Sequence, residues 1–317
     1  MAKISSDISE AIKFLKSGEV IGIPTETVYG LAGNALDENA LLKIFEVKNR
    51  PKFDPLIMHT DTLDKIEDYA FGLNDKAKKL ADAFWPGPLT LLLDRKPRVP
   101  DLLTAGSQRV AVRVPNHTLT RELLEKLKFP IAAPSANPFG YVSPTTAQHV
   151  NDQLGERIPF ILDGGPCDIG LESTIIGFEE DKPIVYRLGG IKLEDIEAQI
   201  GKVRLKVNLS SNPLAPGMLK SHYAPAKKIL IGKVSDLVSK NQSKKIGVIS
   251  FKEDFSSLGI SRQIILSEHG NMNEAAKNLF SALRELDQSD VELIITHRFP
   301  EEGLGKAIND RLHRASA

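Results

Sequence analysis

The first 200 residues alternate between short apolar runs and longer amphipathic segments. The runs are rich in Val, Ile and Leu and end at Gly, Pro or polar residues, which is typical of strands buried within a sheet. They predict strands at residues 20–23, 56–58, 89–93, 110–114, 131–133, 160–162, 174–177 and 184–187.

The amphipathic segments repeat apolar residues every three or four positions, which predicts helices with one buried face. Such helices are expected at residues 8–15, 37–48, 63–69, 74–84, 117–128 and 145–153. Ser6 or Asp7 can cap the first of them, and Asn74 can cap the fourth. Because strands and helices interleave without strict alternation, we expect an α/β fold with a twisted mixed sheet flanked by helices.

The pattern starts again after residue 228. Apolar runs at residues 229–231, 246–249, 264–266 and 293–296 predict short strands, and a helix over 273–286 separates the last two. This arrangement predicts a small α/β domain with a Rossmann-like parallel sheet. No glycine-rich phosphate loop follows these strands, so the sequence does not support nucleotide binding there.

The segment between the two patterns is basic and interrupted by proline and glycine. Residues 201–225 contain no acidic residue, and their basic residues are Lys202, Arg204, Lys206 and Lys220. We interpret residues 201–227 as a cationic linker, between a domain at 1–200 and a second at 228–317. A plain spacer and a segment that contacts an anion are both compatible with this composition.

Composition narrows the function classes. With 41% hydrophobic and 26% charged residues, the 317-residue chain is typical of globular proteins with two domains. Lys and Arg together number 41, as do Asp and Glu, which argues against a dedicated nucleic-acid binder but allows a local cationic cleft. Cys167 is the one cysteine, which excludes an internal disulfide and a cysteine-rich zinc site. With no apolar run of membrane-spanning length and no signal-peptide pattern, we expect a cytoplasmic protein without a membrane partner.

Hydroxyl groups and cations gather at the ends of the first predicted elements. Two strand ends and one helix end would bring together Thr25, Thr27, Lys48, Arg50, Lys52 and His59. Hydroxyls beside fixed cations suit an anion, above all phosphate, because charge-assisted hydrogen bonds are strong. The alternative is a solvated helix end stabilised by the helix dipole. Since no Gly-x-x-x-x-Gly-Lys-Ser/Thr loop occurs, bound phosphates would have to be held by side chains. We expect Arg50→Ala to impair turnover much more than folding.

Several segments in order resemble the YrdC/Sua5 family, the threonylcarbamoyl-adenylate synthases of tRNA modification. They are PTETVYGL at 24–31, KNRP at 48–51, PLIMH at 55–59, RVP at 113–115, PSAN at 134–137, ESTI at 172–175 and SHYAP at 221–225. The resemblance spans nearly the whole chain. It implies a YrdC-like N-terminal domain and a Sua5-type C-terminal domain.

The resemblance also implies a reaction. Bicarbonate and the amino group of L-threonine form a carbamate, which attacks the α-phosphate of ATP and expels pyrophosphate. Mg²⁺ is expected to accompany ATP, with no metal ligands from the protein. The threonylcarbamoyl-AMP product would pass to the tRNA threonylcarbamoyl transferase machinery. A cationic concave surface could also bind RNA weakly.

The site residues implied by the resemblance fall into three groups. Contacts with L-threonine are expected from Thr27, His59, Arg113, Ala133 and Ser173. Contacts with ATP are expected from Arg50, Asp54, Arg109, Ser135, Ser143, Arg187 and Tyr223. Lys48 and Arg50 are expected to act in catalysis.

Some of these positions carry further expectations. Asp54 stands where asparagine is usual, and its carboxylate would repel phosphate unless it faces a ribose hydroxyl or the metal. Arg109 replaces a small hydroxyl residue, so a backbone contact is expected there. Tyr223 lies in the cationic linker, which could therefore close over the cleft as a lid that excludes water.

Two other functions stay open on the sequence. An RNA-binding module would use the same cationic surface without turning over ATP. A carbamoyl transferase of the hydrogenase-maturation type contains a related domain. That enzyme also needs acylphosphatase and cysteine-rich zinc segments, and a single cysteine argues against it.

Overall fold

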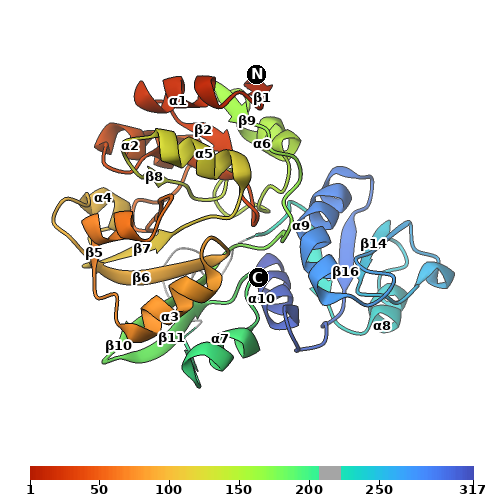
Figure 1. Cartoon of the computed structure of the whole chain (residues 1–317). Helices are drawn as coiled ribbons and strands as arrows, with labels where there is room; N and C mark the ends of the chain where they lie inside the picture. The colour runs from red at the N-terminus through yellow and green to blue at the C-terminus, as the bar shows by residue number, and fades with distance from the viewer. Residues whose placement is uncertain (207–222) are drawn as a thin grey trace.

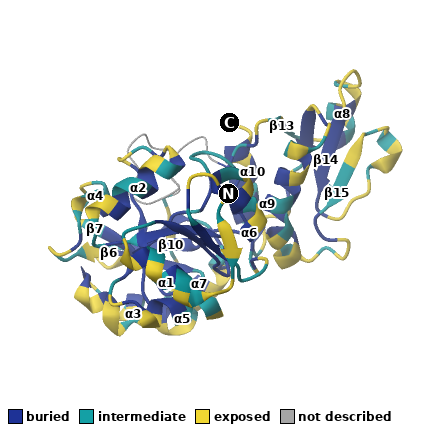
Figure 2. Cartoon of the chain, turned by 90° about the horizontal axis from the view of Figure 1, so that it is seen from above, coloured by how far each residue is buried: buried dark blue, intermediate teal, exposed yellow. Residues whose placement is uncertain are grey.

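The computed structural model describes residues 1–206 and 223–317. The first range folds into a mixed sheet with helices packed against it, and the second forms a smaller parallel sheet with its own helices (Figure 1). The central strands are buried, strands such as β1 and β15 are partly exposed, and the helices turn exposed faces outward (Figure 2). This two-part α/β architecture is the one expected from the hydrophobic pattern.

The larger sheet has twelve strands within the described residues. They are β1 (Lys3–Ser5), β2 (Ile21–Ile23), β3 (Gly30–Asn34), β4 (Ile57–His59), β5 (Ala70–Phe71), β6 (Leu89–Arg95), β7 (Arg109–Arg113), β8 (Ile131–Ala132), β9 (Phe160–Leu162), β10 (Thr174–Glu179), β11 (Lys182–Arg187) and β12 (Arg204–Leu205). Their order is β1-β9-β2-β3-β8-β4-β7-β6-β10-β11-β12, with β5 paired to β6. The pairing is mixed, since β4 runs parallel to β7 while β6 runs antiparallel to it.

Helices between these strands bury their apolar stripes on the sheet or on one another. They are α1 (Ile8–Lys16), α2 (Glu38–Lys48), α3 (Asp75–Phe84), α4 (Asp101–Thr104), α5 (Thr118–Lys126), α6 (Ala147–Leu154) and α7 (Leu193–Ile200), with a 3-10 turn at η1 (Asp64–Asp68). Asp7, Asp37 and Asn74 cap α1, α2 and α3 through side-chain bonds to backbone N–H groups.

The smaller sheet is parallel throughout, in the order β13-β16-β14-β15. Its elements are β13 (Lys228–Ile231), α8 (Val234–Ser239), β14 (Ile246–Ser250), η2 (Ser256–Leu258), β15 (Arg262–Ile265), α9 (Met272–Gln288), β16 (Leu293–Thr296) and α10 (Gly305–Ala315). The predicted Rossmann-like character agrees with this topology.

Helices α9 and α10 lie between the smaller sheet and the larger domain (Figures 1 and 2). Their apolar side chains share one buried cluster with Val28, Val142, Leu171 and Tyr223. The C-terminal domain is therefore packed directly against segments that lead to the strand ends of the N-terminal domain.

Some elements differ from the sequence-based expectation. Residues 30–34 form strand β3, although their composition, Gly-Leu-Ala-Gly-Asn, lacks the usual β-formers. Helices α7 and α10 had no predicted counterpart. The buried face of α10 includes Arg311 and Arg314, which a hydrophobic pattern counts as polar.

The predicted linker is only partly described. Residues 204–205 extend the larger sheet as β12, parallel to β11, rather than forming free linker. Residues 207–222 of the linker that was predicted to act as a lid, His222 among them, lie outside the described residues. Within the part of the chain that the structure describes, the helices are too short or too polar to span a lipid bilayer.

Candidate active site

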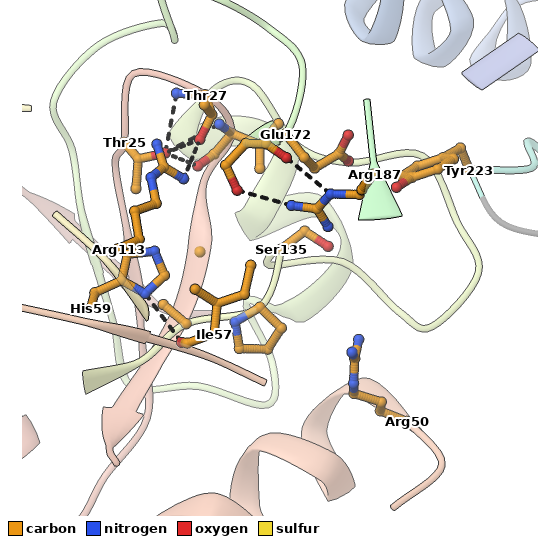
Figure 3. A pocket seen from close by; sticks show the side chains of 15 residues that line it. Thr25, Thr27, Arg50, Ile57, His59, Arg113, Ser135, Glu172, Arg187 and Tyr223 are labelled. Carbon is orange, nitrogen blue, oxygen red and sulfur yellow. Dashed lines mark hydrogen bonds between the residues drawn. The ribbon is translucent and has the colours of Figure 1, made fainter. Parts of the chain in front are cut away.

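A single cavity forms where several strand ends and loops of the larger domain meet (Figure 3). It has about 570 Å³ of empty space, including its open mouth. Its lining includes most of the predicted site residues: Thr27, Arg50, His59, Arg113, Ala133, Ser135, Ser173, Arg187 and Tyr223. Arginines far apart in the sequence therefore converge on one concave surface.

The loop after β2 forms one wall. The Thr25 hydroxyl accepts the backbone N–H groups of Thr27 and Val28 and donates to the Val28 carbonyl at 2.6 Å. Because the Thr25 hydroxyl proton is engaged by the Val28 carbonyl, the Thr27 hydroxyl is the donor in the 2.7 Å hydrogen bond between the two threonines. The remaining acceptor capacity of Thr27 receives a 2.9 Å hydrogen bond from Arg113. These bonds fix the Thr27 hydroxyl at the cavity surface.

Arg113, at the end of β7, is fixed by several polar contacts. Its guanidinium forms a 2.7 Å ion pair with Glu26 and donates to the Gly87 carbonyl at 3.2 Å. Both partners in the ion pair are buried. Glu26 was not predicted as a site residue, although it lies between the two threonines of the PTETVYGL motif. It orients the arginine that the resemblance assigns to the threonine carboxylate.

His59 ends β4 beside Arg113, as the parallel pairing of β4 and β7 requires. Burial, assisted by the charge of Arg113, lowers the pKa of His59 to about 3. The imidazole is therefore neutral at physiological pH. Its Nδ1 lies 3.2 Å from the Ile57 carbonyl, so Nδ1 donates and Nε2 keeps its lone pair. His59 thus offers a hydrogen-bond acceptor rather than a positive charge.

Arg50 follows the C-terminal end of α2 and is fixed by the next loop. It donates to the carbonyls of Asp54 and Pro55 at 3.1 and 2.9 Å, and forms a 2.9 Å ion pair with the Asp54 carboxylate. Asp54 is fully buried and does not line the cavity, so its carboxylate faces Arg50. Because Arg50→Ala would strip the ion-pair partner from a buried carboxylate, the expectation that it spares folding does not fit this geometry.

Lys48 also stands behind the cavity rather than in it. Its Nζ donates to the carbonyls of Ser135 and Asn137, the latter at 2.5 Å. Burial, together with the charge of Arg50, holds the pKa of Lys48 well below its usual value. The Asn137 side chain donates to the Pro138 and Tyr141 carbonyls. Lys48 therefore anchors the loop that presents Ser135, and its catalytic role stays a prediction.

The opposite wall comes from the segment before β10 and the end of β11. Arg187 donates to the Ser173 carbonyl and hydroxyl, both at 3.0 Å, and Thr90 shares a 2.7 Å hydrogen bond with the same hydroxyl. Glu172 lines the cavity next to Ser173. It was not predicted, although it opens the ESTI motif.

The two remaining predicted nucleotide contacts lie outside the cavity lining. Arg109 sits at the opposite end of β7 from Arg113 and bonds to the Tyr186 hydroxyl and the Phe178 carbonyl at 3.1 and 3.2 Å. The Ser143 hydroxyl donates to Glu172 at 2.6 Å. A direct side-chain contact of either with ATP is therefore not supported.

The site contains few groups suited to a metal ion. The described residues include no cluster of three or more His, Cys, Asp or Glu that could hold one. The carboxylates nearest the cavity are engaged by arginines, Asp54 by Arg50 and Glu172 by Arg311. The donor set does not fit a cation bound by the protein alone.

Comparisons with known proteins agree on one family. The Sua5/YciO/YrdC family model, described as telomere recombination, matches residues 13–189, and that of the threonylcarbamoyl-AMP synthase C-terminal domain matches residues 191–317. A threonylcarbamoyl-AMP synthase of Pyrococcus abyssi is 40% identical over 96% of this chain and 93% of its own. One from Bacillus subtilis is 39% identical over 98% and 92%. The crystal structure of P. abyssi Sua5 complexed with L-threonine superimposes with a TM-score of 0.93 at 38% identity, covering 99% of this chain and 97% of that one.

Proposed function

The chain belongs to the Sua5/YrdC family, and from this premise we propose that it is an L-threonylcarbamoyl-AMP synthase. It condenses L-threonine, bicarbonate and ATP into threonylcarbamoyl-AMP, pyrophosphate and water. The observation that carries this proposal is the convergence of Arg50, Arg113 and Arg187 with the Thr27 hydroxyl on one cavity. Relatives with about 40% identity over nearly their full length carry the same name.

One side of the cavity suits the amino acid. The Arg113 guanidinium supplies positive charge for a carboxylate and holds the Thr27 hydroxyl beside it, and Ser173 lines the cavity from the opposite wall. Neutral His59 can accept an N–H from the amino group without repelling it. Since the amine must be unprotonated to combine with bicarbonate, a neutral neighbour suits this step better than an imidazolium would.

The other side suits the triphosphate. Arg50 and Arg187 line the cavity and are fixed by hydrogen bonds to backbone carbonyls, so little reorganisation is needed when phosphate binds. Ser135 adds a hydroxyl from the loop that Lys48 anchors. The proposed chemistry is in-line substitution at phosphorus, in which positioning and charge neutralisation dominate. Arg50 is the catalytic cation, while Lys48 and Asp54 position the groups around it.

We propose that Mg²⁺ enters as part of the ATP substrate, because the described residues include no cluster of three ligands and the Asp54 and Glu172 carboxylates are paired with arginines. The product would pass to the tRNA threonylcarbamoyl transferase machinery in the cytoplasm. Weak RNA binding stays a prediction, and salt dependence of RNA affinity would test it.

The test is pyrophosphate release with each substrate omitted in turn. We expect release only when L-threonine, bicarbonate and ATP are all present, with threonylcarbamoyl-AMP identified by mass spectrometry. Release that continues without L-threonine would overturn the substrate assignment. Serine in place of threonine is the matched control, since it lacks one methyl group.

A further inference from the structure

The C-terminal domain places one fully buried arginine, Arg311 of α10, against the wall of the cavity. Its Nε donates to the Glu172 carboxylate at 2.8 Å. A second guanidinium nitrogen donates to the Leu188 carbonyl at 2.8 Å, next to Arg187 in sequence. One side chain from the second domain thus fastens both segments that form this wall.

Arg311 is itself held in place from two directions. Asp310 forms a 2.6 Å ion pair with it. The Tyr223 ring lies 4.9 Å from its guanidinium carbon and stacks on Phe280 of α9 at 5.6 Å between ring centroids. The same arginine therefore also supports Tyr223, a predicted nucleotide contact at the cavity surface.

Charge gives this contact a further consequence. Among the described residues that line the cavity, Glu172 is the acidic one. Burial raises the pKa of Glu172, but the charges of Arg311 and Arg187 outweigh that effect and hold it below its usual value. The group is thus a carboxylate in a cavity proposed to bind a triphosphate. Without a counterion it would repel phosphate and compete for Arg187.

We propose that Arg311 is a positioning residue through which the C-terminal domain completes the ATP site: it fixes the Glu172 carboxylate and neutralises its charge in the cavity that binds the phosphates. This inference rests on the proposed function for its substrate. It assigns the C-terminal domain a role in ATP binding even though its own sheet lacks a phosphate loop.

The test is a double-mutant cycle on the full-length chain. Arg311→Met removes the counterion, and we expect KM for ATP and the dissociation constant of a non-hydrolysable ATP analogue to rise tenfold or more. Adding Glu172→Gln removes the carboxylate, so the double variant should regain most of the affinity that the single variant loses. Glu172→Gln alone should weaken analogue binding less than Arg311→Met, because Asp310 still pairs with Arg311.

A purely structural role predicts a different pattern. If Arg311 acts only in domain packing, the double variant will bind the analogue as poorly as Arg311→Met, and the proposal fails. It also fails if Arg311→Met leaves the affinity unchanged. Should Arg311→Met not fold, Arg311→Gln with and without Glu172→Gln gives the same comparison, because glutamine also removes the charge while its amide can still donate a hydrogen bond.

A matched control lies on the same helix. Lys306 forms a 3.5 Å surface ion pair with Glu194 across the domain boundary, away from the cavity. Lys306→Met should leave both KM for ATP and analogue binding within twofold of the parent. The analogue titration also separates the two proposals. If the parent chain binds the analogue but releases no pyrophosphate, the proposed function fails while the Arg311 cycle is still decided by binding. If it does not bind the analogue, both proposals fail.

Discussion

The carboxyl ends of the parallel strands have different surroundings in the two sheets of this protein. In the larger sheet, the parallel neighbours β4 and β7 end in His59 and Arg113, which line the cavity. In the smaller sheet, the parallel neighbours β14 and β16 lead into Phe251 and His297. There the rings pack on Phe299, at 5.5 Å from Phe251 and 5.2 Å from His297 between centroids. Parallel topology brings the carboxyl ends of neighbouring strands together. The side chains that follow each strand decide whether a ligand can bind there.

At the strand ends of the larger sheet, buried polar contacts keep the cavity open. Arg113 is held by Glu26 and Arg50 by Asp54, so the charged groups are fixed without filling the space between them. At the corresponding strand ends of the smaller sheet, the His297 Nδ1 donates to the Arg298 carbonyl at 3.0 Å and its Nε2 accepts from the Phe251 backbone N–H at 3.3 Å. The following predictions test whether function follows this difference.

The largest effect is expected at Arg113. Arg113→Met removes the charge assigned to the threonine carboxylate, and turnover should fall by about 100-fold, the typical loss for one preorganised donor. Steady-state pyrophosphate release at varied threonine concentration measures it. Arg113→Lys is the control, because it keeps a positive charge beside Glu26 but loses the forked guanidinium. Its turnover should lie between those of the parent and Arg113→Met. Turnover within threefold of the parent for Arg113→Met would remove Arg113 from the site.

The next effect separates activity from stability at Arg50. Arg50→Ala should lower turnover at least tenfold, about 1.4 kcal/mol at the transition state. It should also cost roughly 3–5 kcal/mol of folding free energy, because the buried Asp54 carboxylate loses its ion pair with Arg50.

Adding Asp54→Asn to Arg50→Ala tests that reason. The double variant should regain stability in urea unfolding while staying inactive, because asparagine carries no charge but cannot bind phosphate as arginine does. A double variant that regains turnover, or a single variant as stable as the parent, would contradict the geometry of this pair.

A pH effect of intermediate size is expected from His59. Its pKa is about 3 in the folded chain and 6.5 in the unfolded one, so the unfolded chain binds the proton first as pH falls. Stability should therefore decrease below pH 6.5 and continue to fall towards pH 3. The loss from this residue at pH 5 is about 2 kcal/mol.

His59→Gln isolates this contribution from those of other titrating groups. Urea unfolding of both proteins at pH 7.5 and pH 5 gives the difference directly. If the parent and the variant lose the same stability over that range, the burial of a neutral His59 is wrong.

The smallest effect is expected at His297, where side chains pack over the strand ends of the smaller sheet. His297→Ala should leave pyrophosphate release within twofold of the parent, since no substrate is assigned there. The loss of its ring stacking and of its hydrogen bond from the Phe251 backbone should cost about 1 kcal/mol in stability. A large loss of turnover in a stable His297→Ala variant would place function at the second sheet as well.

The sequence predicted the architecture because apolar periodicity reports which faces are buried. It failed at α10, where Arg311 and Arg314 occupy buried positions that only tertiary partners make tolerable. Strand β3 was missed because its glycines and alanine lack strand propensity and are held by their neighbours in the sheet.

The site was predicted as a set of motifs rather than as a geometry. The resemblance assigned Arg50, Arg113 and Arg187 to one site, and all three line the same cavity. It could not show that Lys48 turns towards the Asn137 carbonyl, or that Arg109 occupies the far end of its strand. Which side of a backbone a side chain takes depends on contacts distant in sequence, such as the one between Glu172 and Arg311.

The most direct measurement is a crystal structure of the chain with L-threonine and a non-hydrolysable ATP analogue. The account predicts the threonine carboxylate beside Arg113 and the phosphates between Arg50 and Arg187, within one cavity of the larger domain. A nucleotide bound instead at the edge of the smaller sheet, beside Phe251 and His297, would contradict it.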